Sequence, residues 1–393
     1  MSRILFLSQW LPFPITNGSK LRIHNLLHSL SEQHAVTLLS FTDRAEAHVG
    51  DSLRGVLYRD IHVVPWQSFQ PSSRRARLGL FSKIPRSFVA TYSPEMANLI
   101  GQTLAADKYD LVIASQTTMA GYAPNFSGVP ALFEEAELGV YYDQYVRVAS
   151  AWQRVRYMPT WLKQRNYLAS LLGQFQACTV VSEQERNLIK RFAPSRCPIY
   201  VVPNFLCLSE YQTPPIAAQP NTLVFTGSFR YFANHDAMVW FLQEILPQIR
   251  AQAPDAQLMI TGDHANLPLP PSEGVVLKGV VADIRPVVAN AWMSIVPLRF
   301  GGGTRLKILE AMALRTPVVT TSKGAEGLDA RHDEHLLIAD TAEDFAAQVI
   351  RLLRDSDLRK RLTANAWQLV RDQYDAAVVL PQFLNLVASL AAN

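Results

Sequence analysis

The sequence predicts an α/β protein with two doubly wound parallel sheets. Short apolar runs of strand length alternate with segments of helical periodicity along nearly the whole chain, which is the order expected for parallel strands joined by crossover helices. The segment 205–221 holds Pro214, Pro215 and Pro220 and shows no periodicity, which indicates a linker between domains. The length of 393 residues suits two domains or one large one.

The first domain is predicted to open with a βαβ unit. Residues 3–8 and 34–41 are apolar enough for buried strands, and a helix is expected to begin at Gly18-Ser19 between them. The loop before this helix follows the carboxyl end of a strand, where open α/β sheets bind ligands. Gly18, Ser19 and Arg22 can therefore reach a ligand, although an ordinary helix start would need none. Further strands are predicted near residues 61–64, 111–114, 131–133, 178–181 and 199–202.

An acidic run, Glu134, Glu135 and Glu137, follows one of these predicted strands. A carboxylate at the end of a strand can orient the hydroxyl of an acceptor. A solvated cluster of charges explains the same run equally well.

Two segments of the first domain mix basic and apolar residues. Residues 69–92 hold five Lys or Arg among Leu and Phe, and residues 147–167 hold five more beside Trp and Tyr. Such mixtures suit contact with an anionic membrane surface. A solvated face with its apolar residues turned inward is the alternative.

A second alternation of strands and helices follows the linker. Strands are predicted near residues 222–225, 257–260, 275–277, 293–298, 318–320 and 336–338, with helices at 236–252, 283–289 and 342–353. The loops after these strands are expected to line one crevice. Ligand-binding candidates in these loops are Gly227, Ser228, Arg230, Gly262 and Gly279. A helical pattern from residue 357 to 391 closes the chain, and Pro381 is expected to break it.

The stretch 300–313 combines a glycine loop with a helix. Gly301, Gly302 and Gly303 allow the backbone to turn sharply and to approach a ligand closely. Thr304 can cap the helix that follows. The pattern predicts a binding loop after a buried strand.

The charges on this helix favour a bound anion. Arg305 and Lys307 are expected in its first turn, where the exposed N–H groups and the helix dipole disfavour positive charge. An anion there would reverse this cost, because the backbone amides and both cations would then converge on it. Glu310, one turn further on, can accept hydrogen bonds from ribose or sugar hydroxyls. An ordinary surface helix after a glycine loop is the alternative.

Composition limits the classes of function. The chain is 49% hydrophobic and 18% charged, a profile of large cores rather than disorder. The net charge of +4 is too small to indicate a nucleic-acid partner and permits an acidic ligand or membrane surface. No apolar run reaches the length of a membrane span, and Cys178, Cys197 and Cys207 lack metal-ligand spacing. We expect buried free thiols and a cytoplasmic protein, whose basic segments can contact the inner face of the membrane.

Several short motifs, in this order, resemble the GT-B glycosyltransferases, specifically family 4 of the retaining enzymes (glycosyl transferases group 1). The resemblance covers nearly the whole chain. The motifs are Asn17-Gly18, Val180-Val-Ser-Glu183, Val201-Val-Pro-Asn204, Phe225-Thr-Gly-Ser228, Asn234-His-Asp-Ala237, Val296-Pro-Leu-Arg299 followed by G-G-G-T-R-L-K-I-L-E-A-M-A, Pro317-Val-Val319 and Gly324-Ala-Glu-Gly327.

The resemblance implies roles for individual residues. Glu310 is similar to the second glutamate of the family's E-x7-E motif, which holds the ribose of the donor. The first glutamate falls at Gly302, a departure shared with the related G-G-G-T-R-x-K subgroup. Arg305 and Lys307, with Arg230 as a third candidate, are implied to meet the diphosphate.

The first domain departs from the family as well. A histidine through which many relatives contact the donor sugar aligns with Ser115, beside Gln116, so this chain lacks that histidine. Arg315 replaces a glycine that is common in the family, and nothing in the sequence explains it.

The resemblance implies transfer of a sugar from a nucleotide diphosphate sugar to a glycan, lipid-linked or small-molecule acceptor with retention of configuration. No metal or other cofactor is expected. Residues 1–205, completed by a last helix at about 371–393, are expected to form the acceptor domain, and 215–370 the donor domain, with a cleft between them. A nucleotide-sugar epimerase on the same architecture and a catalytically inactive binding subunit are the alternatives.

Overall fold

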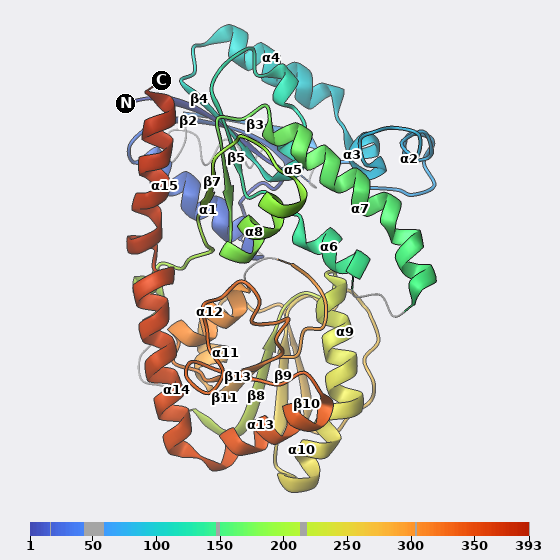
Figure 1. Cartoon of the computed structure of the whole chain (residues 1–393). Coiled ribbons are helices and arrows are strands. Elements are labelled where there is room, and N and C mark those ends of the chain that lie inside the picture. The colour runs from blue at the N-terminus through green and yellow to red at the C-terminus, as the bar shows by residue number, and fades with distance from the viewer. Residues whose placement is uncertain (16, 43–58, 147–149, 213–217, 303–304, 393) are drawn as a thin grey trace. The chain divides into compact units, whose positions relative to one another are not determined.

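The computed structural model describes residues 1–15, 17–42, 59–146, 150–212, 218–302 and 305–392. It confirms an α/β protein with two parallel sheets. The chain divides into two compact units, unit 1 with Met1–Pro203 and Leu380–Asn393, and unit 2 with Asn204–Val379. Figure 1 shows that each unit has a sheet of its own.

Unit 1 contains a seven-stranded sheet in the order β3-β2-β1-β4-β5-β6-β7, with every pair of neighbours parallel. This order, with β1 central, is the arrangement expected for a doubly wound sheet. Strand residues such as Leu5, Val112 and Phe133 are fully buried because helices cover both faces. The strands are β1 (Arg3–Ser8), β2 (Ala35–Thr42), β3 (Asp60–Pro65), β4 (Leu111–Ser115), β5 (Ala131–Glu134), β6 (Ala177–Val180) and β7 (Ile199–Val201).

The helices of unit 1 begin where their sequences supply N-caps. Ser93 accepts a hydrogen bond from the amide of Met96 at the start of α4, and Ser182 accepts one from Glu185 at the start of α8. Two short helices, α2 and α3, lie in the basic and apolar segment 69–92. The helices are α1 (Gly18–Ser31), α2 (Arg74–Leu78), α3 (Arg86–Thr91), α4 (Pro94–Ala106), α5 (Gln116–Ala120), α6 (Gly139–Val146), α7 (Ala151–Leu172) and α8 (Glu183–Phe192).

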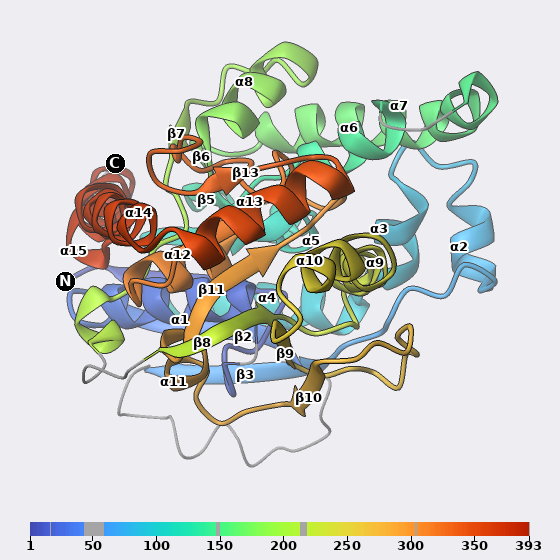
Figure 2. The ribbon, with the colours of Figure 1, turned by 90° about the horizontal axis from the view of Figure 1, so that it is seen from below.

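Unit 2 contains a six-stranded parallel sheet in the order β10-β9-β8-β11-β12-β13. Its core joins sheet residues such as Leu258 to Phe241 and to Phe345 from α13. The strands are β8 (Gln219–Thr226), β9 (Gln257–Thr261), β10 (Val275–Gly279), β11 (Ala291–Val296), β12 (Val318–Thr320) and β13 (Leu337–Ile338). The helices are α9 (Phe232–Trp240), α10 (Leu246–Gln252), α11 (Arg285–Ala289), α12 (Leu306–Ala313), α13 (Ala342–Arg354), α14 (Ser356–Leu369) and α15 (Ala376–Ala391), of which α15 continues into unit 1. Figure 2 shows α9, α10 and α13 beside the sheet from a second direction.

Two helices differ from the prediction. The helix expected at 236–252 is two helices, α9 and α10, joined by a π-helical turn at Phe241–Ile245, which lies just before Pro247. Proline cannot donate the backbone hydrogen bond of a regular helix, which favours such an irregular turn. The predicted break at Pro381 is wrong, because Pro381 lies inside α15 and the chain leaves the helical conformation at Asp375 instead (ψ 141°).

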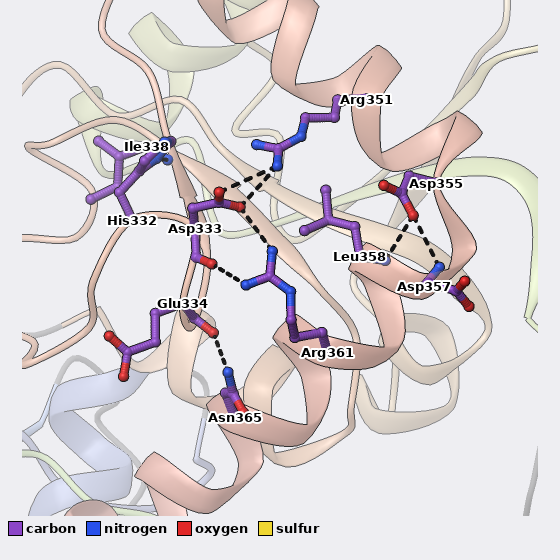
Figure 3. Close-up of polar contacts among 10 residues, drawn as sticks. All are labelled: His332, Asp333, Glu334, Ile338, Arg351, Asp355, Asp357, Leu358, Arg361 and Asn365. Atoms are coloured by element: carbon purple, nitrogen blue, oxygen red, sulfur yellow. Dashed lines mark hydrogen bonds and ion pairs between the residues drawn. The ribbon is translucent and has the colours of Figure 1, made fainter.

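The loop between β12 and β13 is tied to α13 and α14 by polar contacts (Figure 3). Asp333 pairs with Arg351 at 3.1 Å and with Arg361 at 3.3 Å, and its carbonyl oxygen also accepts a bond from Arg361. Asp355 caps α14 by accepting bonds from the amides of Asp357 and Leu358 at 3.1 and 2.8 Å. These contacts fix one edge of the unit 2 sheet to its helical layer.

Within the described part of the chain, no helix combines the length and the apolar character needed to cross a bilayer. The three cysteines are free thiols, and Cys178 and Cys197 are buried while Cys207 is partly buried. Burial raises the pKa of Cys197 to about 11. These thiols are therefore packing residues rather than reactive ones.

Candidate functional site

Three glycine loops of unit 2 meet at the carboxyl ends of β8, β9 and β10. The amide of Gly227 donates to the Thr261 carbonyl at 3.0 Å, and the amide of Gly262 donates to the Gly279 carbonyl at 2.8 Å. A Cβ atom on Gly227 (φ 146°) would lie 2.7 Å from Asn234 Nδ2 and 2.8 Å from Lys307 Nζ. Only glycine fits this position, so backbone groups and the tip of Lys307 come close together here.

The loop after β11 approaches the same end of the sheet. Gly301 has a φ of 104°, and a Cβ atom there would overlap the Tyr231 hydroxyl and lie 3.1 Å from Arg305 Nη2. Gly303 and Thr304 lie outside the described residues. The glycines predicted to bind a ligand therefore lie at or just after the carboxyl ends of strands β8 to β11. They are Gly227, Gly262, Gly279 and Gly301.

Arg305 stands immediately before α12, which begins at Leu306. The expectation that Arg305 lies within the first turn is wrong by one residue, because its ψ of 89° is not helical. Its side chain is buried, with 7% exposed, and Nη1 donates to the carbonyl of Gly302. Nε and Nη2 are buried and find no acceptor among the described residues. A buried guanidinium with two unused donors is costly, and an anionic ligand would satisfy both donors.

Lys307 lies in the first turn of α12, where its ammonium group faces the loop after β8. Nζ donates to Asn234 Oδ1 at 2.9 Å and lies 4.3 Å from the centre of the Phe225 ring. Burial, followed by the charge of Arg305, lowers the pKa of Lys307 to about 7. The protonated form therefore needs an additional negative charge to be fully favoured.

Glu310 occupies the next turn and has a partner that the sequence did not reveal. Tyr211, in the short helix Leu208–Tyr211, donates its hydroxyl to Glu310 Oε1 at 3.1 Å. Burial raises the pKa of Glu310 to about 7. One hydrogen bond thus orients the carboxyl group, and among the described residues no donor engages its other oxygen, which can accept bonds from hydroxyl groups. Tyr211 was missed because it belongs to the linker region, which has no periodicity.

Arg230 is less well placed for a ligand than the other cations. Its side chain is 77% exposed and pairs with the carboxylate of Asp263, which follows β9. Hydrogen bonds from the Ala265 amide and from Arg230 lower the pKa of Asp263, so the pair is charged at neutral pH. Ser228 supports the same corner, because its hydroxyl donates to the Asp263 carbonyl at 3.3 Å and its own carbonyl accepts from Asn234 Nδ2 at 2.8 Å.

In unit 1, Arg22, Glu134 and Ser115 form one buried group. Arg22 is 2% exposed and Glu134 fully buried. Arg22 Nε donates to Glu134 Oε1 at 2.8 Å, Ser115 Oγ donates to Glu134 Oε2 at 2.6 Å, and Arg22 Nη1 donates to the Pro203 carbonyl at 2.9 Å. Both oxygens of Glu134 are therefore occupied within the protein. The group connects α1 with the ends of β4, β5 and the segment after β7.

Gln116 and Glu135 form a second pair at the ends of the neighbouring strands β4 and β5. Both have left-handed backbones, with φ 69° and 58°, and Gln116 Nε2 donates to Glu135 Oε2 at 3.1 Å. Burial, together with the negative charge of Glu134, raises the pKa of Glu135 to about 8. Strained non-glycine residues with a shifted carboxyl pKa at strand ends are typical of functional positions.

The remaining predicted positions of unit 1 lie near these groups in sequence. Gly18 and Ser19 open α1, whose N-cap is Asn17, with the Asn17 side chain accepting from the Lys20 amide at 2.9 Å. Glu137 is partly buried, and its charge adds to the effects that raise the pKa of Glu135.

Residues 220–355 match a family model described as glycosyl transferases group 1. This segment contains all the site residues of unit 2 described above except Tyr211. A curated relative, an uncharacterized 44.6 kDa protein in the cps region of Klebsiella pneumoniae, is 26% identical over 168 residues. The match covers 40% of this chain and 43% of the length of the relative.

Solved structures resemble the whole chain. HepE of Anabaena, in complex with UDP and glucose, has a TM-score of 0.69 at 16% identity and covers 99% of this chain and 100% of its own. Sucrose-phosphate synthase of Thermosynechococcus elongatus has a TM-score of 0.73 at 18% identity and covers 100% of both chains. These likenesses confirm the predicted GT-B fold of two Rossmann-like units. The family match covers residues 220–355 of the chain, and the likenesses to solved structures concern the fold.

Proposed function

We propose that this chain transfers a sugar from a nucleoside diphosphate sugar to a glycan, lipid-linked or small-molecule acceptor, with retention of the anomeric configuration and without a metal. The subgroup of family 4 with the G-G-G-T-R-x-K-x-x-E motif is the proposed relationship. The observation that carries the proposal is Arg305, a buried guanidinium beside a glycine loop and a helix start, with two donors that find no acceptor among the described residues. Such a site selects an anion with several oxygen acceptors, as a diphosphate has.

The donor is assigned to unit 2, within the residues proposed as the donor domain, 215–370. Arg305, Lys307 and the loop from Gly301 to Thr304 are proposed to hold the diphosphate. Glu310 is proposed to accept hydrogen bonds from the ribose hydroxyls. HepE has been crystallised with UDP and with UDP-glucose, so a uracil nucleotide is the first donor to test.

The acceptor is assigned to residues 1–205 and the last helix. Glu135 is the carboxyl group best suited to orient an acceptor hydroxyl, because both oxygens of Glu134 are already engaged. Gln116 is proposed to position Glu135 through the bond of 3.1 Å between them. Gly18 and Ser19 at the start of α1 are proposed to face the acceptor, and Arg22 is the buried support of Glu134.

The proposed chemistry depends on charge at the leaving group. When the bond to the sugar breaks, negative charge grows on the terminal phosphate oxygens of the nucleoside diphosphate. Arg305 is buried and Lys307 is partly buried at the proposed diphosphate site, so both need little reorganisation to stabilise the transition state. A fixed site of this kind lowers the barrier more than it improves binding of the ground state.

Release of UDP from UDP-glucose and related donors tests the proposal directly. A panel of glycan and lipid-linked acceptors in the presence of EDTA should give acceptor-dependent UDP release and a product with the donor's anomeric configuration. Conversion of the donor sugar without any acceptor would point to an epimerase. Tight UDP binding with no turnover on any acceptor would point to an inactive binding subunit. Gly302 and Ser115 motivate this alternative, because both depart from the family's residues.

We also propose that residues 69–92 and 147–167 of a cytoplasmic enzyme contact an anionic membrane surface. Of the second segment, residues 150–167 are described and fall mostly in α7, with Trp152 and Val155 exposed. The attraction is expected to be strongest at low salt. Flotation with phosphatidylglycerol vesicles is the test, and failure to float at low salt would exclude this contact.

A further inference from the structure

A pocket of about 500 Å³ opens in unit 1 among α2, α3, α5 and Tyr167 of α7. Its walls include four aromatic rings, Phe88, Tyr92, Tyr122 and Tyr167, and the charged residue in its lining is Arg75. This volume and this mainly apolar lining are typical of sites that enclose a small molecule. None of the residues proposed above for sugar transfer lines it.

The aromatic walls are held by contacts with each other rather than by a ligand. The rings of Tyr92 and Tyr122 stack at 5.0 Å, and those of Phe88 and Tyr167 lie 5.3 Å apart. The Tyr122 hydroxyl accepts a bond from the Ser93 amide at 2.9 Å. A Cβ atom on Gly121 would lie 2.8 Å from the Tyr167 hydroxyl, so glycine leaves the room that this ring occupies. The pocket is therefore preformed, which reduces the cost of binding.

The surface around the pocket is basic throughout. Residues 61–94 contain five Lys or Arg and no Asp or Glu, and α7 contains four Lys or Arg and no acidic residue. Lys163 of α7 donates to the Leu80 carbonyl at 2.6 Å, which joins the two segments into one surface, and Figure 1 shows α2 and α3 beside α7. None of the five cations in 61–94 forms an ion pair with a described residue. An occupant of this pocket is therefore expected to carry negative charge.

The rim of the pocket is unusually apolar for a surface in water. Leu78 is 61% exposed and Phe81 is 91% exposed, and Leu80 and Ile84 are exposed beside them. A contiguous group of exposed apolar side chains among cations suits the boundary between lipid head groups and hydrocarbon. The occupant thus has an apolar part that the rim and pocket can cover.

We infer that this pocket binds the hydrocarbon chain of a phosphate-bearing lipid, with the chain among the aromatic rings and the phosphate at Arg75. The inference deepens the acceptor side of the proposed function. Its test uses no sugar donor, so its failure leaves the donor site of unit 2 unaffected. Conversely, absence of UDP binding would leave the lipid pocket standing.

Calorimetry with farnesyl phosphate below its micellar concentration tests the pocket. Farnesyl phosphate should bind, farnesol should bind roughly tenfold more weakly or worse, and inorganic phosphate alone should not bind measurably, because chain and phosphate contribute together. Arg75→Gln should weaken farnesyl phosphate binding by roughly tenfold to a hundredfold, as expected for one charge-assisted contact. Arg77→Gln is the matched control, because it removes the same charge from the same helix and Arg77 does not line the pocket.

A second pair of variants tests where the chain lies. Val89→Trp should fill the pocket and abolish binding of farnesyl phosphate. If Val89→Trp fails to fold, Leu78→Ser at the exposed rim should still weaken binding, since a side chain that is 61% exposed contributes little to the core. Equal effects of Arg75→Gln and Arg77→Gln, or unchanged binding in Val89→Trp and Leu78→Ser, would overturn the inference.

Vesicles of phosphatidylcholine and phosphatidylglycerol in equal parts identify the source of the lipid. If a bilayer lipid occupies the pocket, Arg75→Gln should lower flotation more than Arg77→Gln does. If the pocket receives a lipid-linked acceptor, both variants should float alike while Arg75→Gln alone loses farnesyl phosphate binding. If the parent protein does not bind farnesyl phosphate at all, the inference is refuted both for a bilayer lipid and for a lipid-linked acceptor.

Discussion

Replacing Arg305 with methionine is expected to stabilise the free protein and, at the same time, to weaken its binding of UDP. The reason is that Nε and Nη2 of Arg305 are buried without an acceptor among the described residues. Each buried donor without a partner costs about 1 to 3 kcal/mol. Methionine keeps a flexible apolar chain in the same space and removes both donors.

The expected change in the free energy of unfolding follows from the interactions that the substitution removes. The substitution also removes the bond from Nη1 to the Gly302 carbonyl, a contribution of about 1 kcal/mol. The free energy of unfolding of the unliganded protein should therefore rise by at least about 1 kcal/mol. Loss of a charge-assisted bond to the diphosphate should cost about 1.5 to 3 kcal/mol, which is roughly a tenfold to 150-fold increase in the Kd for UDP.

Urea unfolding and calorimetry measure the two effects separately. Uridine lacks the diphosphate and should bind Arg305→Met as it binds the parent. Arg299→Met is the control, because Arg299 donates two bonds to Asp236 at 3.0 and 2.8 Å and should lose stability on substitution without changing UDP binding. If Arg305→Met is less stable than the parent and binds UDP equally well, the guanidinium is structural and this loop does not hold the diphosphate.

Four further expectations concern the pH dependence of binding and two structural carboxylates. The affinity for UDP relative to that for uridine should fall as the pH rises through about 7, because burial lowers the pKa of Lys307 to about 7 and only its protonated form attracts the diphosphate; in calorimetry, Lys307→Met should remove this fall in the UDP-to-uridine ratio. The affinity for uridine itself should rise over the same pH range, because burial raises the pKa of Glu310 to about 7 and its ionised carboxylate is the better acceptor of hydroxyl hydrogen bonds. Glu310→Ala should weaken the binding of uridine and of UDP alike, by about 1.5 to 3 kcal/mol. Unchanged uridine binding in this variant would refute the role of Glu310. Glu134→Gln should lower the free energy of unfolding by about 3 to 5 kcal/mol, since it removes the buried carboxylate that pairs with Arg22. A loss below about 1 kcal/mol in urea titrations would contradict this expectation. Asp355→Ala should cost about 1 kcal/mol through loss of the α14 cap, measured in the same titrations, and Asp355→Asn should retain most of it.

The position of the proposed donor site could be inferred from the sequence because its signals are local. A buried strand, a glycine loop and a helix with two cations and a glutamate stand within one short stretch, so their order in the chain also fixes their order in space. The strand ends at Gly227 and Gly262 could be added because parallel strands place their carboxyl ends at one edge of a sheet. Which donor and which acceptor are used has no such local signal.

The polar partners within each unit could not be predicted, because they are far apart in the chain. Tyr211 and Glu310 are separated by 99 positions, and Arg22 and Glu134 by 112. The periodicity of apolar residues describes one helix or strand at a time. It carries no information about which side chains of different elements contact each other. The interpretation of Glu134 as part of a solvated cluster or an acceptor site thus overlooked a buried ion pair.

Local rules also failed where a competing effect was stronger. Pro381 was expected to end a helix, yet α15 continues past it, with Val379, Phe383 and Val387 buried. Burial of these side chains along one helix outweighs the loss of a single backbone hydrogen bond. The chain bends at Asp375 instead, where no rule based on proline or glycine points.

The boundary of unit 1 inside α15 has a consequence for the order of synthesis. Residues Leu380–Asn393 belong to unit 1 although they are translated after all of unit 2. On the ribosome, unit 2 therefore emerges entire while unit 1 still lacks the helix that carries the buried Phe383 and Val387. A nascent chain interrupted before residue 380 would carry a complete second unit and an incomplete first unit. The apolar surface that the missing helix covers would then be exposed, and chaperones or proteases would recognise it.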